Sequence, residues 1–178
     1  MVKAIPDGYH TLTPYLVVGD AAKAIEFYRK AFGVTEIMRM VEPGGKRIMH
    51  AELMVGDSRL MLSDTYAEMG GKNPKDLKGT PVTVHVYSED ADALAARASK
   101  AGAKIIMPVA EMFWGDRFGK VKDPFGHEWS IATHVKDLTP AQFAKAAAAA
   151  FEQHEALQKK APARKKATAK KKATKKRK

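Results

Sequence analysis

The sequence predicts an α+β protein built from two paired βαβββ modules, followed by a C-terminal helix and a disordered basic tail. One reason is that the same order of β-rich and helix-forming segments occurs twice, roughly 67 to 70 residues apart. The other is that twelve of the 31 Lys and Arg residues lie in the last twenty positions. The expected parts are a domain at 1–136 with modules 9–66 and 80–134, a helix at 137–158 and a tail at 159–178.

The first module begins with a β-rich run at 11–18 and an amphipathic helix. Asp20 can cap that helix and Gly33 can end it. Between them, apolar side chains recur at helical spacing: Ala24, Phe27, Tyr28 and Ala31. Three β-like runs follow, at 35–41, 47–55 and 59–62. Gly56 and Asp57 are typical of a two-residue hairpin turn, which would pair Val55 with Ser58.

The second module repeats this order with a strand at 82–88 and a helix that Gly102 ends. Its helical stripe consists of Ala91, Leu94, Ala95 and Ala98. Three β-like runs follow, at 104–109, 117–122 and 128–133, with a turn signal at 123–126. A single βαβββ unit leaves one sheet face open, so we expect the two units to form a curved mixed sheet around a cleft. Such a cleft is the default ligand site.

After the repeat, Thr139 and Pro140 are typical of a helix start, and strong helix formers continue to about residue 159. The tail has no large apolar residue and repels itself, so it should be disordered alone. Its cations can contact nucleic acid or another polyanion through phosphates, without reading bases. The candidate contacts are Lys165, Lys166, Lys170, Lys171, Lys172, Lys175, Lys176 and Arg177.

Composition excludes several classes of protein. The absence of cysteine removes disulfides, thiolate zinc sites and a cysteine nucleophile. No run of 18 apolar residues occurs, and residues 1–10 lack the order of a signal peptide, so a cytoplasmic protein without a transmembrane segment is expected, with the nucleoid as a possible place of action. No nucleotide fingerprint such as GxGxxG is present, so we expect no cofactor of that kind.

Strand parity selects a group of polar residues that can face the cleft. With the hairpin turn at Gly56, Glu52 lies opposite Met61 and His50 lies opposite Ser63. His85 shares a face with Thr83, as Tyr15 does with Thr13. His50, Glu52 and His85 are therefore the candidate catalytic residues, either as acid, base and orienting group or as ligands of a divalent metal. A purely structural role for these histidines is the competing interpretation.

A second candidate site is the loop at 111–120. Trp114, with its aromatic neighbours, supplies flat apolar surface beside one charge of each sign, from Asp116 and Arg117. This combination suits a planar or anionic ligand. Packing of the aromatic rings against the sheet is the alternative.

Three sequence segments resemble the vicinal-oxygen-chelate superfamily, which includes glyoxalases, bleomycin resistance proteins and dioxygenases. They are DAAKAIEFYRKAFG, HAELMVGDSRLMLSD and EMFWGDRFGKVKDPFGHEW, and the resemblance is strongest to its PhnB-like branch. It covers roughly residues 8–135 and implies the paired-module fold and a homodimer. Metal-dependent members place ligands on the first and last strand of each module, which correspond here to Thr13, Met61, Thr83 and Ser130. None of these is a good metal ligand, so we expect no metal at the usual positions.

Three hypotheses follow from these residues and from the resemblance. The first is a small-molecule-binding protein of the PhnB-like type whose tail contacts a polyanion. The second is a metal-dependent lyase or dioxygenase that uses His50, Glu52 and His85. The third is a nucleoid-associated protein in which the folded part serves only for dimerisation.

Overall fold

The computed structural model describes residues 2–160, and their side chains as far as residue 156. It confirms the α+β class and both modules. The chain divides after Asp137 into two compact units, which are described separately. The elements of the first unit are β1 (Tyr15–Val18), α1 (Ala21–Phe32), β2 (Thr35–Val41), β3 (Ile48–Val55), β4 (Ser58–Asp64), η1 (Ala67–Met69), β5 (Thr83–Tyr87), α2 (Ala91–Ala101), β6 (Lys104–Glu111), β7 (Asp116–Lys122) and β8 (Glu128–His134).

Each module forms its own four-stranded mixed sheet, and the two sheets have the same topology. The strand orders are β1-β4-β3-β2 and β5-β8-β7-β6. In each sheet the first strand pairs in parallel with the fourth, and the other pairs are antiparallel. The predicted register is confirmed, because Val55 pairs with Ser58 across the turn and Glu52 pairs with Met61. The outer edges of β1 and β5 form no ladder within the described residues.

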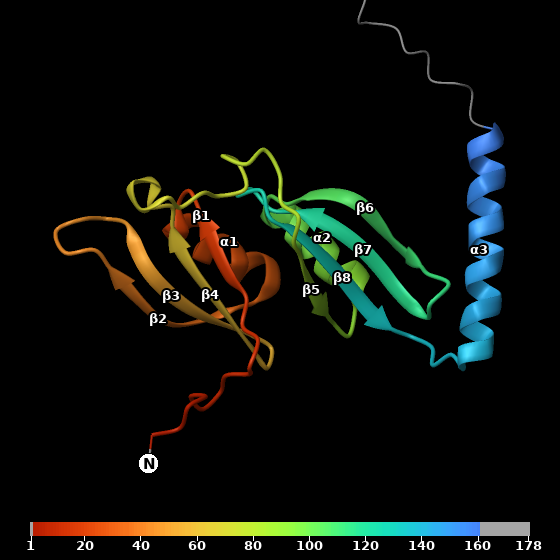
Figure 1. Ribbon diagram of the computed structural model, residues 1–178, viewed down its shortest axis with the longest axis horizontal. Coiled ribbons are helices and arrows are strands. Elements are labelled where there is room, and N and C mark those ends of the chain that lie inside the picture. The colour runs from red at the N-terminus through yellow and green to blue at the C-terminus, as the bar shows by residue number, and fades with distance from the viewer. Residues whose placement is uncertain (1, 161–178) are drawn as a thin grey trace, which may run out of the picture. The chain divides into compact units, whose positions relative to one another are not determined.

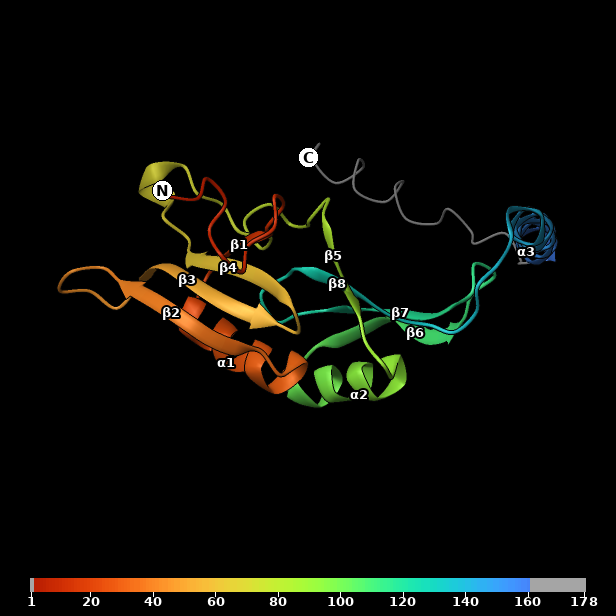
Figure 2. The ribbon, with the colours of Figure 1, turned by 90° about the horizontal axis from the view of Figure 1, so that it is seen from below.

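The two helices lie side by side and cover the same side of both sheets, and we call the opposite faces, which neither helix covers, the open faces (Figures 1 and 2). Asp20 and Asp90 cap α1 and α2 by accepting hydrogen bonds from backbone N–H groups of their first turns. Gly33 and Gly102 end the helices in the left-handed region. The core lies between helices and sheets, and its largest fully buried side chain is Trp129.

The buried carboxylate of Asp123 accepts four hydrogen bonds, from donors in both modules. Asp123, after β7, accepts hydrogen bonds from Tyr28 Oη at 2.8 Å and from Trp129 Nε1 at 3.0 Å. Its other oxygen accepts from the backbone N–H groups of Phe125 and His127, which form the predicted turn. Because Tyr28 lies on α1 of the first module, this carboxylate ties the two modules together.

The ends of some elements differ from the prediction. β1 begins at Tyr15 rather than at residue 11, so Thr13 lies outside the strand. Pro14 explains this, because proline has no N–H to donate to a ladder. The short 3-10 helix η1 was not predicted from the sequence.

The second unit contains α3 (Pro140–Lys160). The predicted start is confirmed, because Thr139 Oγ1 accepts from the N–H of Gln142 at 3.3 Å. The Gln142 side chain accepts in return from the N–H of Thr139 at 2.9 Å, which completes a capping box. The tail at 161–178, including all eight candidate nucleic-acid contacts, lies outside the described residues.

Candidate functional site

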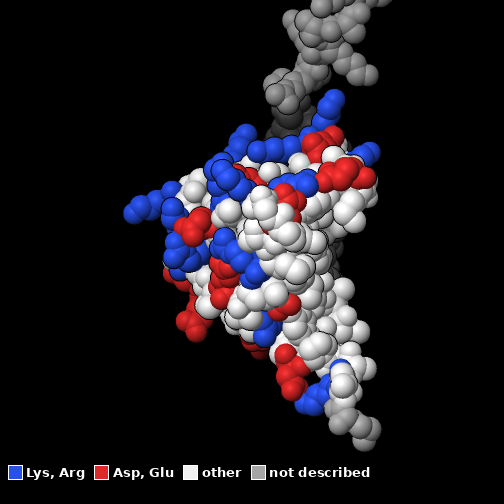
Figure 3. Space-filling view, turned by 90° about the vertical axis from the view of Figure 1, so that its left-hand side faces the viewer, with Lys and Arg blue, Asp and Glu red and all other residues white. Residues whose placement is uncertain are grey.

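The open face of the first sheet carries few charges. Figure 3 shows the first module from the side of β2, with charged side chains mostly on the helix side and uncharged residues over much of the opposite side. Apolar side chains of β2 are exposed on this face. Met38 is 41% exposed and Met40 is 47% exposed. Met38 pairs with Glu52 and Met40 with His50, so the face combines apolar surface with two titratable groups.

Three polar side chains form a chain across this face. Tyr15 Oη lies 3.2 Å from His50 Nδ1, and His50 Nε2 lies 3.3 Å from Glu52 Oε1. The Tyr15 and His50 rings also pack together, with centroids 5.6 Å apart. With the proton assigned to Nε2, Glu52 orients the imidazole and Nδ1 accepts from the Tyr15 hydroxyl. The arrangement thus runs from a carboxylate through an imidazole to the hydroxyl of Tyr15, a residue that is 47% exposed.

The environment of Glu52 favours its ionised form. The hydroxyl of Tyr9, followed by the imidazole of His50, lowers the pKa of the Glu52 carboxyl, although Tyr9 Oη makes no hydrogen bond of normal geometry. Arg59 adds to this from 3.7 Å. Burial, and then the neighbouring Glu52, raises the pKa of the Tyr9 hydroxyl. Glu52 is therefore an anion at neutral pH and can stabilise a protonated His50.

The open face of the second sheet is aromatic. His85 Nδ1 lies 2.7 Å from Ser130 Oγ. The His85 ring packs on Phe118 at 6.1 Å and on Tyr87 at 4.6 Å between centroids. Trp114 extends the cluster, with its ring 5.4 Å from that of Phe118. This surface offers flat apolar contact and one hydrogen-bonded imidazole.

Tyr15 and His85 hold equivalent positions in the two modules. Tyr15 lies across from Met61, and His85 lies across from Ser130. Each ring packs on an aromatic ring of the third strand of its sheet, which is His50 in one module and Phe118 in the other. Within residues 2–160, His85 therefore makes its contacts on the second sheet and none with His50 or Glu52. The shared cavity expected for His50, Glu52 and His85 therefore stays a prediction, with no contact among the described residues that joins His85 to the other two.

The strand pairing also changes which residues of β1 and β5 occupy the metal-ligand positions that the resemblance implies. The residues that face Met61 and Ser130 are Tyr15 and His85, two positions beyond Thr13 and Thr83. Only His85 among the paired residues is a common metal ligand. Within the described part of the chain, no group of three or more His, Asp or Glu side chains is arranged to hold a metal ion. The residues present do not fit the metal that the resemblance implies.

Asp116 and Arg117, which the sequence placed together in the 111–120 loop, have different partners in the structure. Asp116 is buried and accepts from Trp114 Nε1 at 3.1 Å, and it also lies 2.7 Å from His134 Nδ1. Arg117 forms a bidentate pair with Asp92 at the start of α2, so its guanidinium lies on the helix side of the sheet. The prediction that Asp116 and Arg117 present opposite charges to one ligand is therefore wrong, because successive strand residues point to opposite faces.

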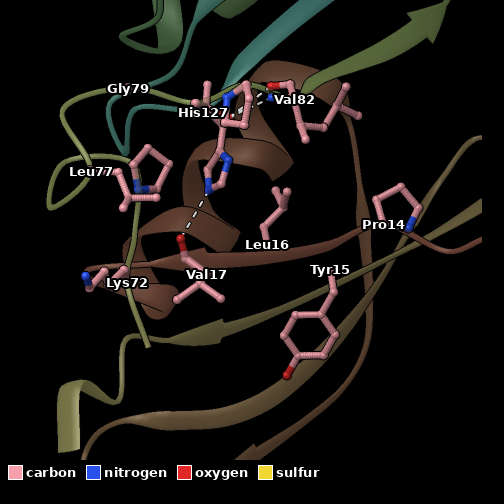
Figure 4. Close-up of a pocket in the computed structure, with 13 residues that line it drawn as sticks. Pro14, Tyr15, Leu16, Val17, Lys72, Leu77, Gly79, Val82 and His127 are labelled. Atoms are coloured by element: carbon pink, nitrogen blue, oxygen red, sulfur yellow. Dashed lines mark hydrogen bonds between the residues drawn. The ribbon is translucent and has the colours of Figure 1, made fainter. Parts of the chain in front are cut away.

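A cavity of about 270 Å³ is lined by β1, by the segment 72–82 that precedes β5, and by Val84 and His127. Its lining is mainly apolar. Figure 4 shows Leu16 directed into it and Tyr15 directed away, toward the open face of the first sheet. His127 Nε2 lies 3.2 Å from the carbonyl oxygen of Val17 and so closes one side.

The other predicted residues remain on the sheets. Thr83 is exposed at the start of β5, and Ser63 is buried in β4. Sequence reasoning missed Tyr9 as a neighbour of Glu52. It precedes the first predicted strand, where no period or turn signal places a side chain, so nothing in the sequence indicated this contact.

A family model provides the first comparison with known proteins. The model of the Glyoxalase/Bleomycin resistance protein/Dioxygenase superfamily matches residues 9–131. An uncharacterized protein of Mycobacterium tuberculosis is 46% identical over 130 residues, which cover 71% of this chain and 76% of that protein. An uncharacterized protein of Arabidopsis thaliana is 34% identical over 129 residues, which cover 68% of this chain and 75% of that protein.

Solved structures agree with the family model. TioX from Micromonospora sp. ML1 is 27% identical, with a TM-score of 0.56 over 71% of this chain and 99% of TioX. Glyoxalase I from Zea mays is 21% identical, with a TM-score of 0.56 over 70% of this chain and 44% of the maize protein, and it shows the fold alone. Within residues 2–160, no helix has the length and apolar character needed to span a membrane.

Proposed function

Because the chain belongs to the Glyoxalase/Bleomycin resistance protein/Dioxygenase superfamily, we propose that it binds a small organic molecule on the open face of the first sheet and moves a proton on that molecule. The observation that carries this proposal is the chain of contacts from Glu52 through His50 to Tyr15. The proposal needs neither a metal nor a cofactor. It retains a PhnB-like, small-molecule-binding role as the core of the function.

The proton path follows from the geometry. The hydroxyl of Tyr15 gives its proton to His50 Nδ1 while it receives one from an acidic C–H or O–H of the ligand. His50 becomes an imidazolium, which the Glu52 carboxylate stabilises across 3.3 Å. Reversal of both transfers returns the proton to the ligand. The apolar surface of Met38 and Met40 beside the relay excludes water from one side of the ligand.

Proton exchange provides the test. The full chain is incubated in D2O with a panel of small carbonyl compounds, and exchange of their acidic C–H groups is followed by NMR. General acid–base catalysis of this kind contributes about 10²- to 10⁴-fold, so Tyr15→Phe and His50→Phe should each lose most of the acceleration. Tyr87→Phe, an exposed tyrosine of the other sheet, is the matched control. Acceleration that survives in Tyr15→Phe would refute the relay.

A homodimer is part of the proposal. β2 is exposed along its whole length, and on the open face Met38 and Met40 are 41% and 47% exposed. Contiguous exposed apolar surface of this kind is typical of a protein interface. A second copy that covers the open faces would bury this surface and enclose the ligand. Sedimentation of the full chain should report a dimer, and Met40→Asp should weaken it, because a buried unpaired carboxylate is costly.

The tail supports a second proposed function, which is polyanion binding that would hold this cytoplasmic protein at the nucleoid. Twelve Lys and Arg residues occupy positions 159–178, without an acidic residue. A full-length variant with Gln at the eight candidate positions from Lys165 to Arg177 should lose DNA retention at low salt. Retention by the unchanged chain should fall steeply as salt rises. Equal retention by the two proteins would remove the tail from the interaction.

A further inference from the structure

A second, larger groove lies where the two modules meet. It measures about 690 Å³, which is within the range of sites for cofactor-sized molecules. Its walls come from the residues before β1, the β3–β4 turn, β5 and α2. Several lining side chains, including Phe32 and Trp129, belong to the buried core below the sheets. The groove therefore reaches toward the helix layer, whereas the Tyr15–His50–Glu52 relay lies on the open face of the first sheet.

Two arginines line this groove without a hydrogen-bonded carboxylate. Arg97, on α2, donates from Nε to the carbonyl oxygen of Ala31 at 2.8 Å, and it forms no ion pair within the described residues. Arg59 has two buried nitrogens, Nε and Nη1, without a hydrogen-bond partner. Its nearest carboxylate, Glu52, lies at 3.7 Å, which is an ion pair but not a hydrogen bond.

Glu52 offsets part of the charge of Arg59, and the residues that line the groove leave the charge of Arg97 uncompensated. Asp57 is the only carboxylate among the lining residues, and its Oδ1 already accepts from the hydroxyl of Ser58 at 2.9 Å. His10 and His85 add imidazoles at the rim. Arg97 thus presents a guanidinium without an ion-pair partner at a groove whose floor is apolar, and Arg59 adds a second guanidinium, packed on the Tyr9 ring, whose buried Nε and Nη1 lack hydrogen-bond partners. Guanidinium groups are the side chains best suited to bind planar oxyanions.

We propose that this groove binds an amphipathic organic anion, with its apolar body against Phe32, Leu94 and Trp129 and its carboxylate, sulfonate or phosphate group at Arg59 and Arg97. The apolar floor selects an aromatic or aliphatic body rather than a bare inorganic ion. The unpaired guanidinium nitrogens select a negative charge at one end. The groove and the proton relay share one contact, the ion pair of Arg59 with Glu52 at 3.7 Å, so Arg97 and Tyr15 are the residues that separate the two sites.

A matched pair of fluorescent probes tests the proposal on the full chain. The anion 8-anilinonaphthalene-1-sulfonate carries a sulfonate, and N-phenyl-1-naphthylamine has the same ring system without it. Arg97→Gln and Arg59→Gln should each weaken binding of the anion by about tenfold or more and leave binding of the neutral probe within about twofold. Arg29→Gln is the control, because Arg29 is exposed and paired with Glu26.

Further variants keep the test decisive. If either arginine variant fails to fold, Ser58→Asp, which keeps both arginines and adds a carboxylate to the lining of the groove, should weaken binding of the sulfonate and spare the neutral probe. Tyr15→Phe should bind both probes as the unchanged chain does, which separates this site from the relay. Equal sulfonate affinity in the arginine variants and in Ser58→Asp would overturn the proposal, as would a parallel loss of both probes.

Discussion

Asp64 and Thr133 occupy equivalent positions at the ends of β4 and β8, and each accepts a hydrogen bond from the first backbone N–H of its module's helix. Ala21 N lies 2.7 Å from Asp64 Oδ1, and Ala91 N lies 2.8 Å from Thr133 Oγ1. Asp64 Oδ2 also accepts from Ile48 N at 2.6 Å. The same structural need, a partner for a buried helix N-terminus, is thus met by two different side chains.

We therefore expect Asp64→Asn to destabilise the protein by about 1–3 kcal/mol, since an amide can accept only one of the two bonds and leaves the other N–H unsatisfied. Urea unfolding of the full chain measures the loss. Thr133→Val should cost a similar amount, because the N–H of Ala91 loses its acceptor and the carbonyl oxygen of Ser88 loses the hydroxyl that donates to it at 2.8 Å. Asp57→Asn, in an exposed turn, is the control. A stability of Asp64→Asn equal to that of the control would contradict this account.

The link between the modules should depend on pH at the alkaline end. Burial, and then the charge and hydrogen bond of Asp123, raise the pKa of Tyr28 well above 10.0. The folded protein therefore holds this proton more tightly than the unfolded chain does. The contribution is fully present below pH 10 and is lost as pH rises above that value, because the unfolded tyrosine then ionises.

The measurement is urea unfolding of the unchanged chain and of Tyr28→Phe from pH 8 to pH 11. The variant should lose about 1.5–3 kcal/mol at neutral pH, since it removes a hydrogen bond to a carboxylate, and its stability should fall less above pH 10. Parallel profiles for the two proteins above pH 10 would show that Tyr28 does not carry the alkaline dependence.

The imidazole of His134 should have a higher pKa than that of an ordinary histidine. Its hydrogen bonds, first with Asp137 and then with Asp116, raise the pKa of the His134 imidazole from its usual 6.5. The interaction stabilises the folded state below pH 6.5 and is lost as pH rises through the raised pKa. NMR titration should show Asp137→Asn lowering this pKa, whereas Asp7→Asn, at the other end of the unit, should leave it unchanged. An unshifted His134 in the unchanged chain would disprove the contact.

Gly119 should not tolerate a side chain. A Cβ there would lie 2.8 Å from Val109 Cγ2 and 3.0 Å from both Val109 N and Met107 O, because β6 approaches β7 closely at this point. Gly119→Ala should cost about 1–3 kcal/mol through overpacking. Gly79→Ala is the matched control: a Cβ there meets nothing within 4 Å, so its stability should stay within about 0.5 kcal/mol of the unchanged chain.

Local signals predicted much of the fold, and the relay shows both their strength and their limit. The turn at Gly56 and the two-residue period of strands correctly placed Glu52 across from Met61. The same reasoning could not place Tyr15 against His50, because that contact requires β4 to lie between β1 and β3. Strand order is a long-range property, which spacing along the chain does not encode.

The sequence by itself determined the two modules, the N-cap of the first helix, the glycines that end both helices and the concentration of positive charge after residue 158, because these depend on periodicity, turn chemistry and composition over short stretches. Only the tertiary structure decided that His85 lies on a different sheet from His50, that Arg117 pairs with Asp92, and that Arg59 and Arg97 line one groove. The physical reason is that these relationships arise where whole elements pack, and packing brings together side chains whose separation in the chain carries no signal.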